Sequence, residues 1–284
     1  MNLIVQGPDV PTPELKHLAK LTGATAIEAA TPTAFRLVGA DPGQRDAVAA
    51  YCEEHGHDHG WVPAERRIGD FGLLVMDMDS TLITIECIDE IADMQGLKPQ
   101  VSAITESAMR GEIDFAESLR RRVALLEGLD QSALQRVYDE RLQLSPGAET
   151  LLAAARAAGI KTLLVSGGFT FFTERLKPRL GLDYTAANTL EVAGGKLTGR
   201  VLGTIVDAQG KADWLKRVRS ELGLTKDQVV AMGDGANDLK MMAEAGVSIA
   251  YRAKPVVRAQ STHALNRVGL EGAVPLLGGA GTGH

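Results

Sequence analysis

The sequence predicts an α/β protein with a doubly wound parallel sheet, a helical cap inserted into that sheet, and a small α+β domain at the N-terminus. From residue 71 onward, short apolar segments alternate with helical patterns, which is typical of a parallel sheet covered by helices. A long helical stretch interrupts this alternation after the first apolar segment. The first 62 residues follow a different, more compact order. These observations favour two domains, which 284 residues can supply at about 100–200 residues each.

The N-terminal segment contains two helical patterns among four strand-like stretches. We expect strands at 3–5, 25–29, 34–38 and 60–62, and helices at 14–21 and 44–54. This β-α-β-β-α-β order is the ferredoxin-like pattern that many small regulatory modules use. A polar stretch, 63–70, follows as a linker. We therefore expect the N-terminal domain to span 1–66 and the second domain 67–284.

The second domain alternates four apolar strands with four helices. The expected strands are 73–78, 161–166, 228–233 and 247–250, and the expected helices are 147–158, 169–180, 211–222 and 237–245. The first strand is almost continuously apolar, which is typical of a strand buried on both faces. Gly159 and Gly246 stand where glycines commonly end helices. We expect the glycine-rich tail, 278–284, to be disordered.

Four further helical patterns fill the insertion at about 86–144, between the first two strands. They cover 88–95, 99–109, 115–126 and 132–141. We interpret the insertion as a cap over the carboxyl ends of the strands, where ligands of open α/β sheets usually bind. The sequence therefore predicts a binding site between the cap and the sheet.

Composition and charge argue against several classes of partner. The net charge of −6 gives no electrostatic reason to expect binding to nucleic acid or to an anionic membrane. The longest uncharged apolar runs fall far short of the ~20 residues that span a bilayer. Cys52 and Cys87 lie far apart and outside any Cys-x-x-Cys pattern, so we expect a reducing compartment, by default the cytoplasm. The sequence leaves a homodimer open.

The segment 77–81, Asp-Met-Asp-Ser-Thr, follows the first apolar strand directly. Two carboxylates in this spacing, Asp77 and Asp79, can face one site if the chain bends there. One of them can then attack a substrate while the other handles protons. The alternative is a solvated turn, in which aspartate and serine are common.

A second acidic segment, 233–238 or Gly-Asp-Gly-Ala-Asn-Asp, follows another apolar strand. By itself it could simply cap a helix. Two carboxylate clusters at strand ends of one sheet would repel each other, and a hard cation would relieve that repulsion. A set of oxygen ligands suits Mg²⁺.

Two weaker signals accompany the acidic segments. Ser166, Gly167 and Gly168 stand at a third strand end, where a hydroxyl and free backbone N–H groups can bind an anion. Many ordinary βα turns have the same composition. Lys211 stands near the start of a helix, and a single lysine is usually an exposed surface residue.

Together, in this order along the chain, these segments resemble the haloacid dehalogenase superfamily of phosphatases, and within it the members that act on a phosphorylated amino acid. The resemblance covers about 71–265. It rests on the segments 77–81, 118–123 (Ser-Leu-Arg-Arg-Arg-Val), 165–169 (Val-Ser-Gly-Gly-Phe) and 233–238, and on Glu86 and Lys211. The N-terminal segment resembles a degenerate amino-acid-binding, or ACT-like, regulatory module.

The resemblance implies Mg²⁺-dependent chemistry through a phosphorylated aspartate. It makes Asp77 the nucleophile that takes the phosphoryl group. It makes Asp79 the general acid that protonates the leaving group and then deprotonates the attacking water. Mg²⁺ is expected to bind Asp77, the backbone carbonyl of Asp79, and Asp234.

The resemblance also assigns the residues that would hold the phosphate. Ser166 and the backbone N–H of Gly167 would bind phosphate oxygens, and Lys211 would offset their negative charge. Asn237 would orient the phosphate or the nucleophile, and Asp238 would position Lys211 from behind.

Substrate choice would fall to the cap. Glu86 resembles the residue that receives the substrate ammonium, and Arg122 resembles the one that clamps its carboxylate. Met109 and Phe115 would form an apolar lid that excludes water. The implied reaction is hydrolysis of L-phosphoserine, a small-molecule substrate, in the last step of serine biosynthesis. Without the resemblance, Glu86 and Arg122 would be read as ordinary solvated helix residues.

Two rival functions stay open on the sequence. The same residues could transfer the phosphoryl group to an amino alcohol such as homoserine, or could act on another small phosphomonoester. A non-catalytic amino-acid sensor is the second rival, although the presence of Asp77, Asp79 and Asp234 together argues against it. The alternating histidines at 55, 57 and 59 could bind a metal such as Zn²⁺, but we interpret them as part of a solvated loop.

Overall fold

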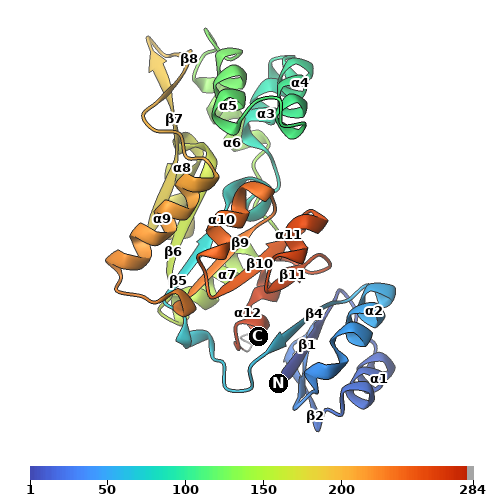
Figure 1. Ribbon diagram of the computed structural model, residues 1–284. Coiled ribbons are helices and arrows are strands. Elements are labelled where there is room, and N and C mark those ends of the chain that lie inside the picture. The colour runs from blue at the N-terminus through green and yellow to red at the C-terminus, as the bar shows by residue number, and fades with distance from the viewer. Residues whose placement is uncertain (280–284) are drawn as a thin grey trace.

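The computed structural model describes residues 1–279 and contains two β-sheets, each with its own helices (Figure 1). The N-terminal segment forms a four-stranded sheet, and the rest of the chain forms a seven-stranded sheet with the cap at one end. The predicted fold class is confirmed in both parts. Of the tail that we expected to be disordered, residues 280–284 lie outside the described residues.

The N-terminal sheet has the predicted ferredoxin-like order of elements. Its strands pair antiparallel in the order β2-β3-β1-β4. Leu3 and Val5 of β1 face the two helices and pack with Leu18 and Leu37. Side chains alternate along a strand, so Ile4 faces the opposite way and joins the core of the second domain. The bounds are β1 (Asn2–Gln6), α1 (Thr12–Thr22), β2 (Ala26–Thr31), β3 (Ala34–Val38), α2 (Arg45–His55) and β4 (Asp58–Val62).

The second sheet has the strand order β11-β10-β9-β5-β6-β7-β8, and all neighbours are parallel except β7 and β8. The strands are β5 (Leu73–Met76), β6 (Lys161–Phe169), β7 (Tyr184–Ala193), β8 (Lys196–Leu202), β9 (Val229–Gly233), β10 (Val247–Tyr251) and β11 (His263–Leu265). The helices are α7 (Ala148–Ala157), α8 (Thr170–Leu180), α9 (Ala208–Glu221), α10 (Leu239–Ala243), α11 (Pro255–Ala259) and α12 (Ala273–Leu276).

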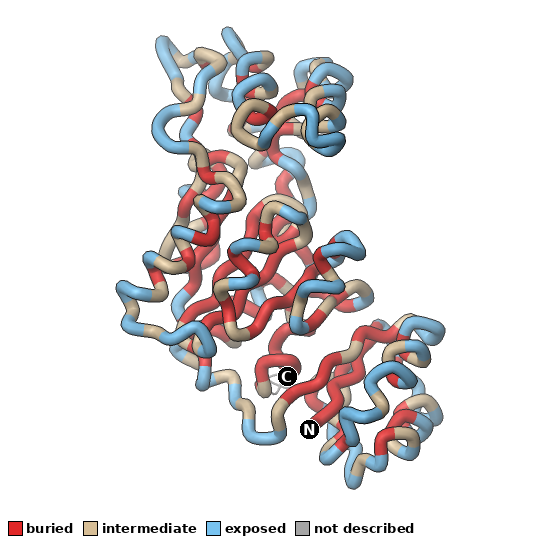
Figure 2. Tube along the Cα trace, viewed as in Figure 1, coloured by how far each residue is buried: buried red, intermediate tan, exposed pale blue. Residues whose placement is uncertain are grey.

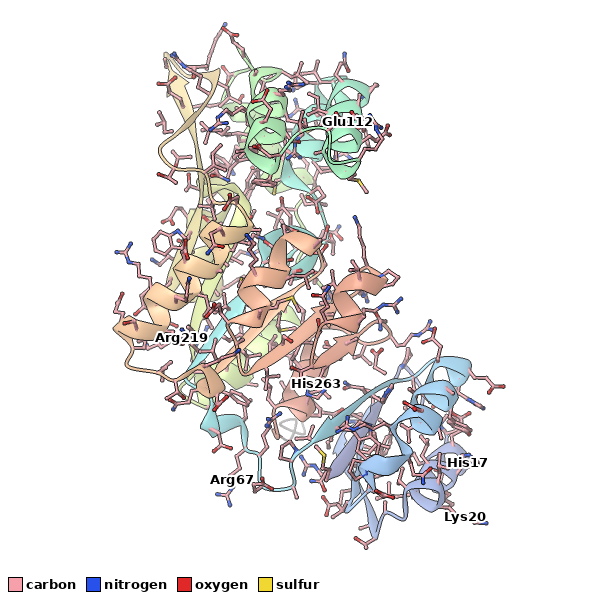
Figure 3. The ribbon with its side chains drawn as sticks, in the orientation of Figure 1. His17, Lys20, Arg67, Glu112, Arg219 and His263 are labelled. Carbon is pink, nitrogen blue, oxygen red and sulfur yellow. The ribbon has the colours of Figure 1, made fainter. Side chains whose placement is uncertain are left out.

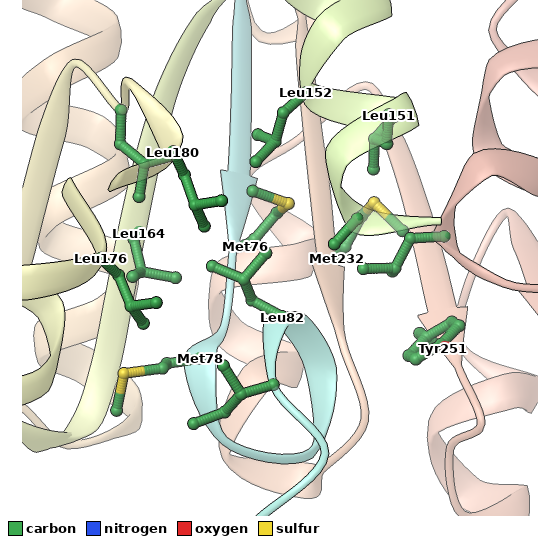
Figure 4. Close-up of a cluster of buried hydrophobic side chains, with 14 of the residues drawn as sticks. Met76, Met78, Leu82, Leu151, Leu152, Leu164, Leu176, Leu180, Met232 and Tyr251 are labelled. Atoms are coloured by element: carbon green, nitrogen blue, oxygen red, sulfur yellow. The ribbon is translucent and has the colours of Figure 1, made fainter. Parts of the chain in front are cut away.

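The central strand β5 shows why this sheet is doubly wound. Leu74 and Met76 face the apolar side chains of α7 and α8, as Figure 4 shows for Met76, whereas Leu73 and Val75 face α9. All four side chains of β5 are buried, and Figure 2 shows the same for most of the neighbouring strands. A strand with helices on both faces must be apolar on both faces, which explains the continuous apolar run.

The cap consists of the four helices that the sequence predicts: α3 (Cys87–Met94), α4 (Lys98–Met109), α5 (Phe115–Ala124) and α6 (Ser132–Glu140). The chain enters and leaves the cap side by side, because Ile83 pairs with Leu144 and the Thr84 N–H donates to the Gln143 carbonyl at 3.0 Å. The cap lies beyond the carboxyl ends of the strands (Figure 1). No helix within residues 1–279 combines the length and the apolar character needed to cross a membrane.

The antiparallel hairpin β7–β8 was not predicted, and it connects the sheet to the cap. Its far strand lies against α5 and the segment that follows it (Figure 1). The Gly128 N–H donates to the Leu197 carbonyl, and the Leu197 N–H donates to the Leu129 carbonyl, both at 2.8 Å. Gly199 has a φ of +77° and brings β8 close to Ala124. The hairpin therefore supports the cap from the side of the core.

Several predicted boundaries need correction. The first strand ends at Met76 rather than at residue 78, because Asp77 turns the chain out of the sheet. The strand β6 continues to Phe169, so the glycine pair stays extended and α8 begins only at Thr170. The helix expected at 237–245 is shorter, and the short elements α11, β11 and α12 were not predicted.

The histidine run is not the solvated loop that we expected. His55 is the last residue of α2, and Gly56, with a φ of +74°, turns the chain directly toward β4. His57 is buried and its Nε2 contacts the carboxylate of Glu14, while His59 lies in β4. The chain has no room for a loop here because α2 and β4 are separated by a single tight turn.

Candidate active site

A cavity of about 400 Å³ lies where β5, β6 and β9 end beneath the cap. Eleven of the twelve predicted site residues line it: Asp77, Asp79, Glu86, Met109, Phe115, Arg122, Ser166, Gly167, Lys211, Asp234 and Asn237. The twelfth, Asp238, is fully buried and contacts Lys211 from behind the cavity wall. The fold therefore brings together residues that are up to 161 positions apart in the sequence, the span from Asp77 to Asp238.

The turn after β5 organises the cavity floor. Asp77 leads into a kinked turn, Met78–Leu82, in which Asp79 and Ser80 are not helical, and its Oδ1 accepts a hydrogen bond from the Met78 N–H at 2.7 Å. Ser80 adopts a left-handed φ of 56° and donates from Oγ to Oε1 of Glu86 at 2.5 Å. Thr81 donates from Oγ1 to Oδ1 of Asp234 at 2.9 Å. This turn thus connects the two acidic segments with the cap, and neither Ser80 nor Thr81 was predicted as a site residue.

Two buried carboxylates share one buried ammonium. Nζ of Lys211 lies 2.8 Å from Oδ2 of Asp77 and 2.8 Å from Oδ1 of Asp238. Burial alone would lower the pKa of Lys211, but the two carboxylates outweigh this effect and raise it. Burial and the charge of Asp238 raise the pKa of Asp77, and Lys211 opposes them. With both carboxylates ionised, Asp77, Asp238 and Lys211 together carry a net charge of −1.

A divalent cation fits this excess of negative charge. One carboxylate oxygen from each of Asp77, Asp234 and Asp238 lies within 4.8 Å of the others. Asp238 already accepts from Lys211 and, at 3.1 Å each, from the N–H groups of Asp234 and Gly235. Asp77 and Asp234 line the cavity whereas Asp238 does not, so these two side chains are the ones that can reach a cation in it. Burial, and then the charge of Asp238, raises the pKa of Asp234 to about 6, and a cation would reverse that shift.

Asp79 lies in a different electrostatic setting. Its Oδ2 accepts from the Cys87 N–H at 3.3 Å, and its buried Oδ1 has no hydrogen-bond partner among residues 1–279. Burial, and then the nearby charge of Glu86, raises the pKa of Asp79 to about 8. A pKa above neutrality suits a general acid, which must hold its proton near neutral pH.

The C-terminal end of β6 offers polar groups to the cavity and is held by a residue that the sequence did not reveal. The Gly168 N–H donates to Oγ of Ser166 at 2.8 Å. The carbonyl of Gly167 accepts from Nδ2 of Asn188, and Oδ1 of Asn188 accepts from the Val206 N–H, both at 2.8 Å. Asn188 is buried in β7 and only tertiary contacts identify it.

The cap closes the cavity with charged and apolar groups. Glu86 precedes α3 and Arg122 lies on α5, so the cap offers an anion and a cation to the same space. Enclosure by the cap and the core raises the pKa of Glu86, although its side chain still reaches solvent in the cavity. A Cβ atom on Gly167 would lie 2.8 Å from Cζ of Phe115, so only glycine lets the ring approach this closely. Met109 lines the mouth and is 69% exposed.

Lys254 also lines the cavity, and the sequence did not predict it as a site residue. It follows β10, and its backbone N–H donates to the Asp234 carbonyl at 3.4 Å. Its exposed side chain adds a cation to the cavity mouth. A single lysine after a strand gives no signal in the sequence, so only the fold reveals its position.

The fold and the site have counterparts among known proteins. A family model of haloacid dehalogenase-like hydrolases matches residues 74–243, and a model of a domain of unknown function, DUF4072, matches residues 3–48. A phosphoserine phosphatase from Polaromonas sp. is 55% identical over 210 residues, which cover 72% of this chain and 89% of the relative. The crystal structure of a probable phosphoserine phosphatase from Vibrio cholerae has a TM-score of 0.86 at 38% identity, covering 98% of this chain and 87% of the other. A structure of a phospho-aspartyl intermediate analogue of phosphoserine phosphatase has a TM-score of 0.68 at 36% identity, covering 72% of this chain and 98% of the other.

Proposed function

The chain belongs to the haloacid dehalogenase-like hydrolases and, within them, to the phosphoserine phosphatases, and we propose on this basis that it hydrolyses O-phospho-L-serine to L-serine and phosphate. This reaction would complete serine biosynthesis. One observation carries the proposal beyond family membership. Asp77 beside Lys211, and Asp79 with its raised pKa, face one cavity whose cap side offers both Glu86 and Arg122.

In the first step, a carboxylate oxygen of Asp77 attacks the phosphorus atom of the substrate. The bond between phosphorus and the serine oxygen breaks, and Asp79 gives its proton to that oxygen. Serine leaves, and the phosphoryl group stays on Asp77 as an aspartyl-phosphate. The 2.8 Å contact from Lys211 favours the ionised nucleophile, while burial and Glu86 favour the protonated acid.

In the second step, Asp79 is ionised and takes a proton from a water molecule whose oxygen attacks the same phosphorus. The bond between phosphorus and Asp77 breaks, which releases phosphate and restores both aspartates. Ser166, the Gly167 N–H, Asn237 and Lys211 line the cavity around the reacting group. We assign them the binding of phosphate oxygens, because positioning and charge compensation supply most of the catalysis in phosphoryl transfer.

We propose Mg²⁺ as the divalent cation. Asp77, Asp234 and the backbone carbonyl of Asp79 would hold it, with Asp238 kept by Lys211 as a supporting group. When bound, Mg²⁺ would balance the excess negative charge of the carboxylates and of the phosphoryl group. All the protein ligands are oxygen atoms, which suits Mg²⁺ better than softer metals.

The cap residues would select the substrate. We assign the substrate ammonium to Glu86 and its carboxylate to Arg122, because the two side chains present complementary charges to the same cavity. The Ser80 hydroxyl holds Glu86 in place. Met109 and Phe115 would close over the reacting group and exclude water.

The proposed division of the chain places the N-terminal, ACT-like domain at 1–66 and the phosphatase domain at 67–284, with the cap at about 86–144. The change of sheet between β4 and β5, and the Ile83–Leu144 pairing at the base of the cap, support these limits. We propose a cytoplasmic location, supported by two free, buried cysteines, and a homodimer as the assembly to be tested by light scattering.

Phosphate release from a matched panel of phosphomonoesters, with Mg²⁺ or with EDTA, tests the proposed function. Phosphoethanolamine lacks only the carboxylate of phosphoserine, and 3-phosphooxypropanoate lacks only the ammonium. Each compound therefore removes the group that one of the two cap residues, Arg122 or Glu86, would bind. We expect strong, Mg²⁺-dependent preference for phosphoserine over both. Equal turnover of all three would refute the substrate assignment, and phosphohomoserine formed in the presence of homoserine would reveal phosphoryl transfer instead of hydrolysis.

A further inference from the structure

A second cavity of about 300 Å³ lies between the N-terminal domain and the edge of the large sheet. Residues of α2 and β4 form one wall, and residues around α11 and β11 form the other. These four elements lie beside one another in Figure 1. No residue lines both this cavity and the active-site cavity. We call it the interdomain cavity.

Three arginines line the interdomain cavity: Arg45 from α2, Arg258 from α11, and Arg267 after β11. None of the ion pairs found within residues 1–279 includes any of them. Three carboxylates, Asp46, Glu53 and Asp58, also line the cavity but make no such pair with the arginines. These guanidinium groups therefore carry N–H donors that form no ion pair with an acidic side chain among residues 1–279.

The carboxylate of Asp58, at the same junction, is already engaged. It accepts hydrogen bonds at 2.8–3.1 Å from the backbone N–H groups of Asn266, Arg267 and Val268. These hydrogen bonds join the N-terminal domain to the large domain. Asp58 forms no ion pair with the three arginines.

A buried histidine at the centre of the junction supplies the decisive observation. His263 of β11 is 5% exposed, lines the interdomain cavity, and has no hydrogen-bond partner on either ring nitrogen among the described residues. Its ring packs against Gly60 of β4, and Figure 3 labels it at this junction. Nε1 of Trp61, which is 7% exposed and lies on the opposite wall in β4, also lacks a partner among the described residues. Buried polar atoms are normally paired, so these two side chains point to a missing ligand.

We propose that the interdomain cavity binds a small oxyanion, a phosphate or a carboxylate group, between the arginines, His263 and Trp61. The lining offers guanidinium, indole and imidazole N–H donors, and a planar guanidinium suits the paired oxygens of phosphate and carboxylate. The proposal does not depend on the hydrolysis of phosphoserine. Because the two walls belong to different domains, a ligand bound there would stabilise their contact.

Trp61 provides a reporter that the active site does not share. The chain has two tryptophans, and Trp214 lies on α9, so a Trp214→Phe variant leaves Trp61 as its sole tryptophan. We would titrate this variant with inorganic phosphate, with malonate, and with chloride, all at constant ionic strength. We expect a saturable change in fluorescence with phosphate or malonate but not with chloride, and the stronger of the two identifies the group that binds.

Matched variants place the effect in the interdomain cavity. Adding Arg258→Gln and Arg267→Gln should weaken the binding at least tenfold, which circular dichroism would separate from loss of folding. Adding Ser166→Ala should leave the fluorescence response unchanged. Thermal unfolding recorded in parallel detects binding that leaves the fluorescence unchanged. The anion should raise Tm more in the Trp214→Phe parent than in the double-arginine variant. A flat fluorescence titration together with equal Tm shifts in both would overturn the proposal.

Discussion

Asp77 and Asp79 are two positions apart, yet different charges act on their carboxyl groups. Lys211 contacts Asp77 at 2.8 Å and opposes the rise in pKa that burial causes. No cation forms an ion pair with Asp79 in the described part of the chain, and burial together with Glu86 raises its pKa to about 8. The bend at Met78–Leu82 separates the two settings although the residues are close in sequence.

The proton held by Asp79 can be tested through the leaving group of the substrate. We expect Asp79→Asn to slow serine release in the first turnover by about 10²–10⁴-fold, the usual contribution of a general acid. The first-turnover release of p-nitrophenol from p-nitrophenyl phosphate should fall much less, because nitrophenolate leaves without a proton. Rapid-quench measurements of the first turnover exclude the later hydrolysis step. Equal losses for both substrates would rule out the acid role of Asp79.

The assignment of Arg122 predicts a loss that depends on the substrate carboxylate. Arg122→Ala should raise KM for phosphoserine by at least tenfold and leave KM for phosphoethanolamine, which has no carboxylate, nearly unchanged. The exposed Arg121, which instead pairs with Glu117 at 2.7 Å, provides the matched control Arg121→Ala. Steady-state kinetics on both substrates measure the difference. A similar rise for both substrates would mean that Arg122 supports the cap rather than binding the carboxylate.

At the scale of single elements, four parallel strands, β5, β6, β9 and β10, and the cap helices were predictable because their apolar patterns match their burial. The hairpin β7–β8 was not, although the Gly194–Gly195 pair at its turn is a recognisable hairpin signal. The site residues at strand ends came from motifs and from a family resemblance. Asn188 could not be found in this way, because its importance arises from partners that are distant in the sequence. Thr81 stands in the segment 77–81, but its role depends on Asp234, which is distant in the sequence.

The C-terminal end of β6 should depend on Asn188. Replacing it with alanine leaves the Gly167 carbonyl and the Val206 N–H unpaired in the interior, at a cost of about 2–4 kcal/mol in the free energy of unfolding. The loosened strand end should also raise KM for phosphoserine. The adjacent and exposed Thr189→Ala should change stability by less than about 0.5 kcal/mol. Urea denaturation and steady-state kinetics test both effects, and an Asn188→Ala variant with unaltered KM would show that the strand end keeps its place without this residue.

At the scale of the whole molecule, the N-terminal domain docks through one face of its sheet. Ile4 and Val62 join the core of the large domain, and Nε2 of Gln6 donates to the Gly272 carbonyl at 3.1 Å. Asp58 adds hydrogen bonds from three successive backbone N–H groups, 266–268. These contacts lie at the β11 edge, and the active-site cavity is lined entirely by residues from 77 onward. Docking and catalysis therefore depend on different residues.

Asp58→Ala should loosen this docking while turnover at room temperature persists. Losing the acceptor of three N–H groups should cost about 3 kcal/mol at the interface. Limited proteolysis should then cut the linker, 63–70, faster than in the unaltered protein. Asp41→Ala provides a control, because this exposed aspartate accepts only a local N–H, from Gly43. Unchanged cleavage in Asp58→Ala would show that apolar packing alone holds the domains together.

The buried His263 predicts how the stability of the docked molecule depends on pH. Burial, and then the charges of Arg66, His59 and Arg45, lowers the pKa of His263 to about 4. Between pH 6.5 and 4 the unfolded histidine binds a proton that the folded one does not, so stability falls as the pH falls through this range. The loss from this residue should be about 1.4 kcal/mol per pH unit once the pH is well below 6.5. Urea denaturation at several pH values, in buffer without phosphate, should show a shallower slope for His263→Gln than for the exposed control His17→Asn. If the two slopes are equal, His263 is either protonated or solvated in the folded protein, and its ring is not closed off between the domains.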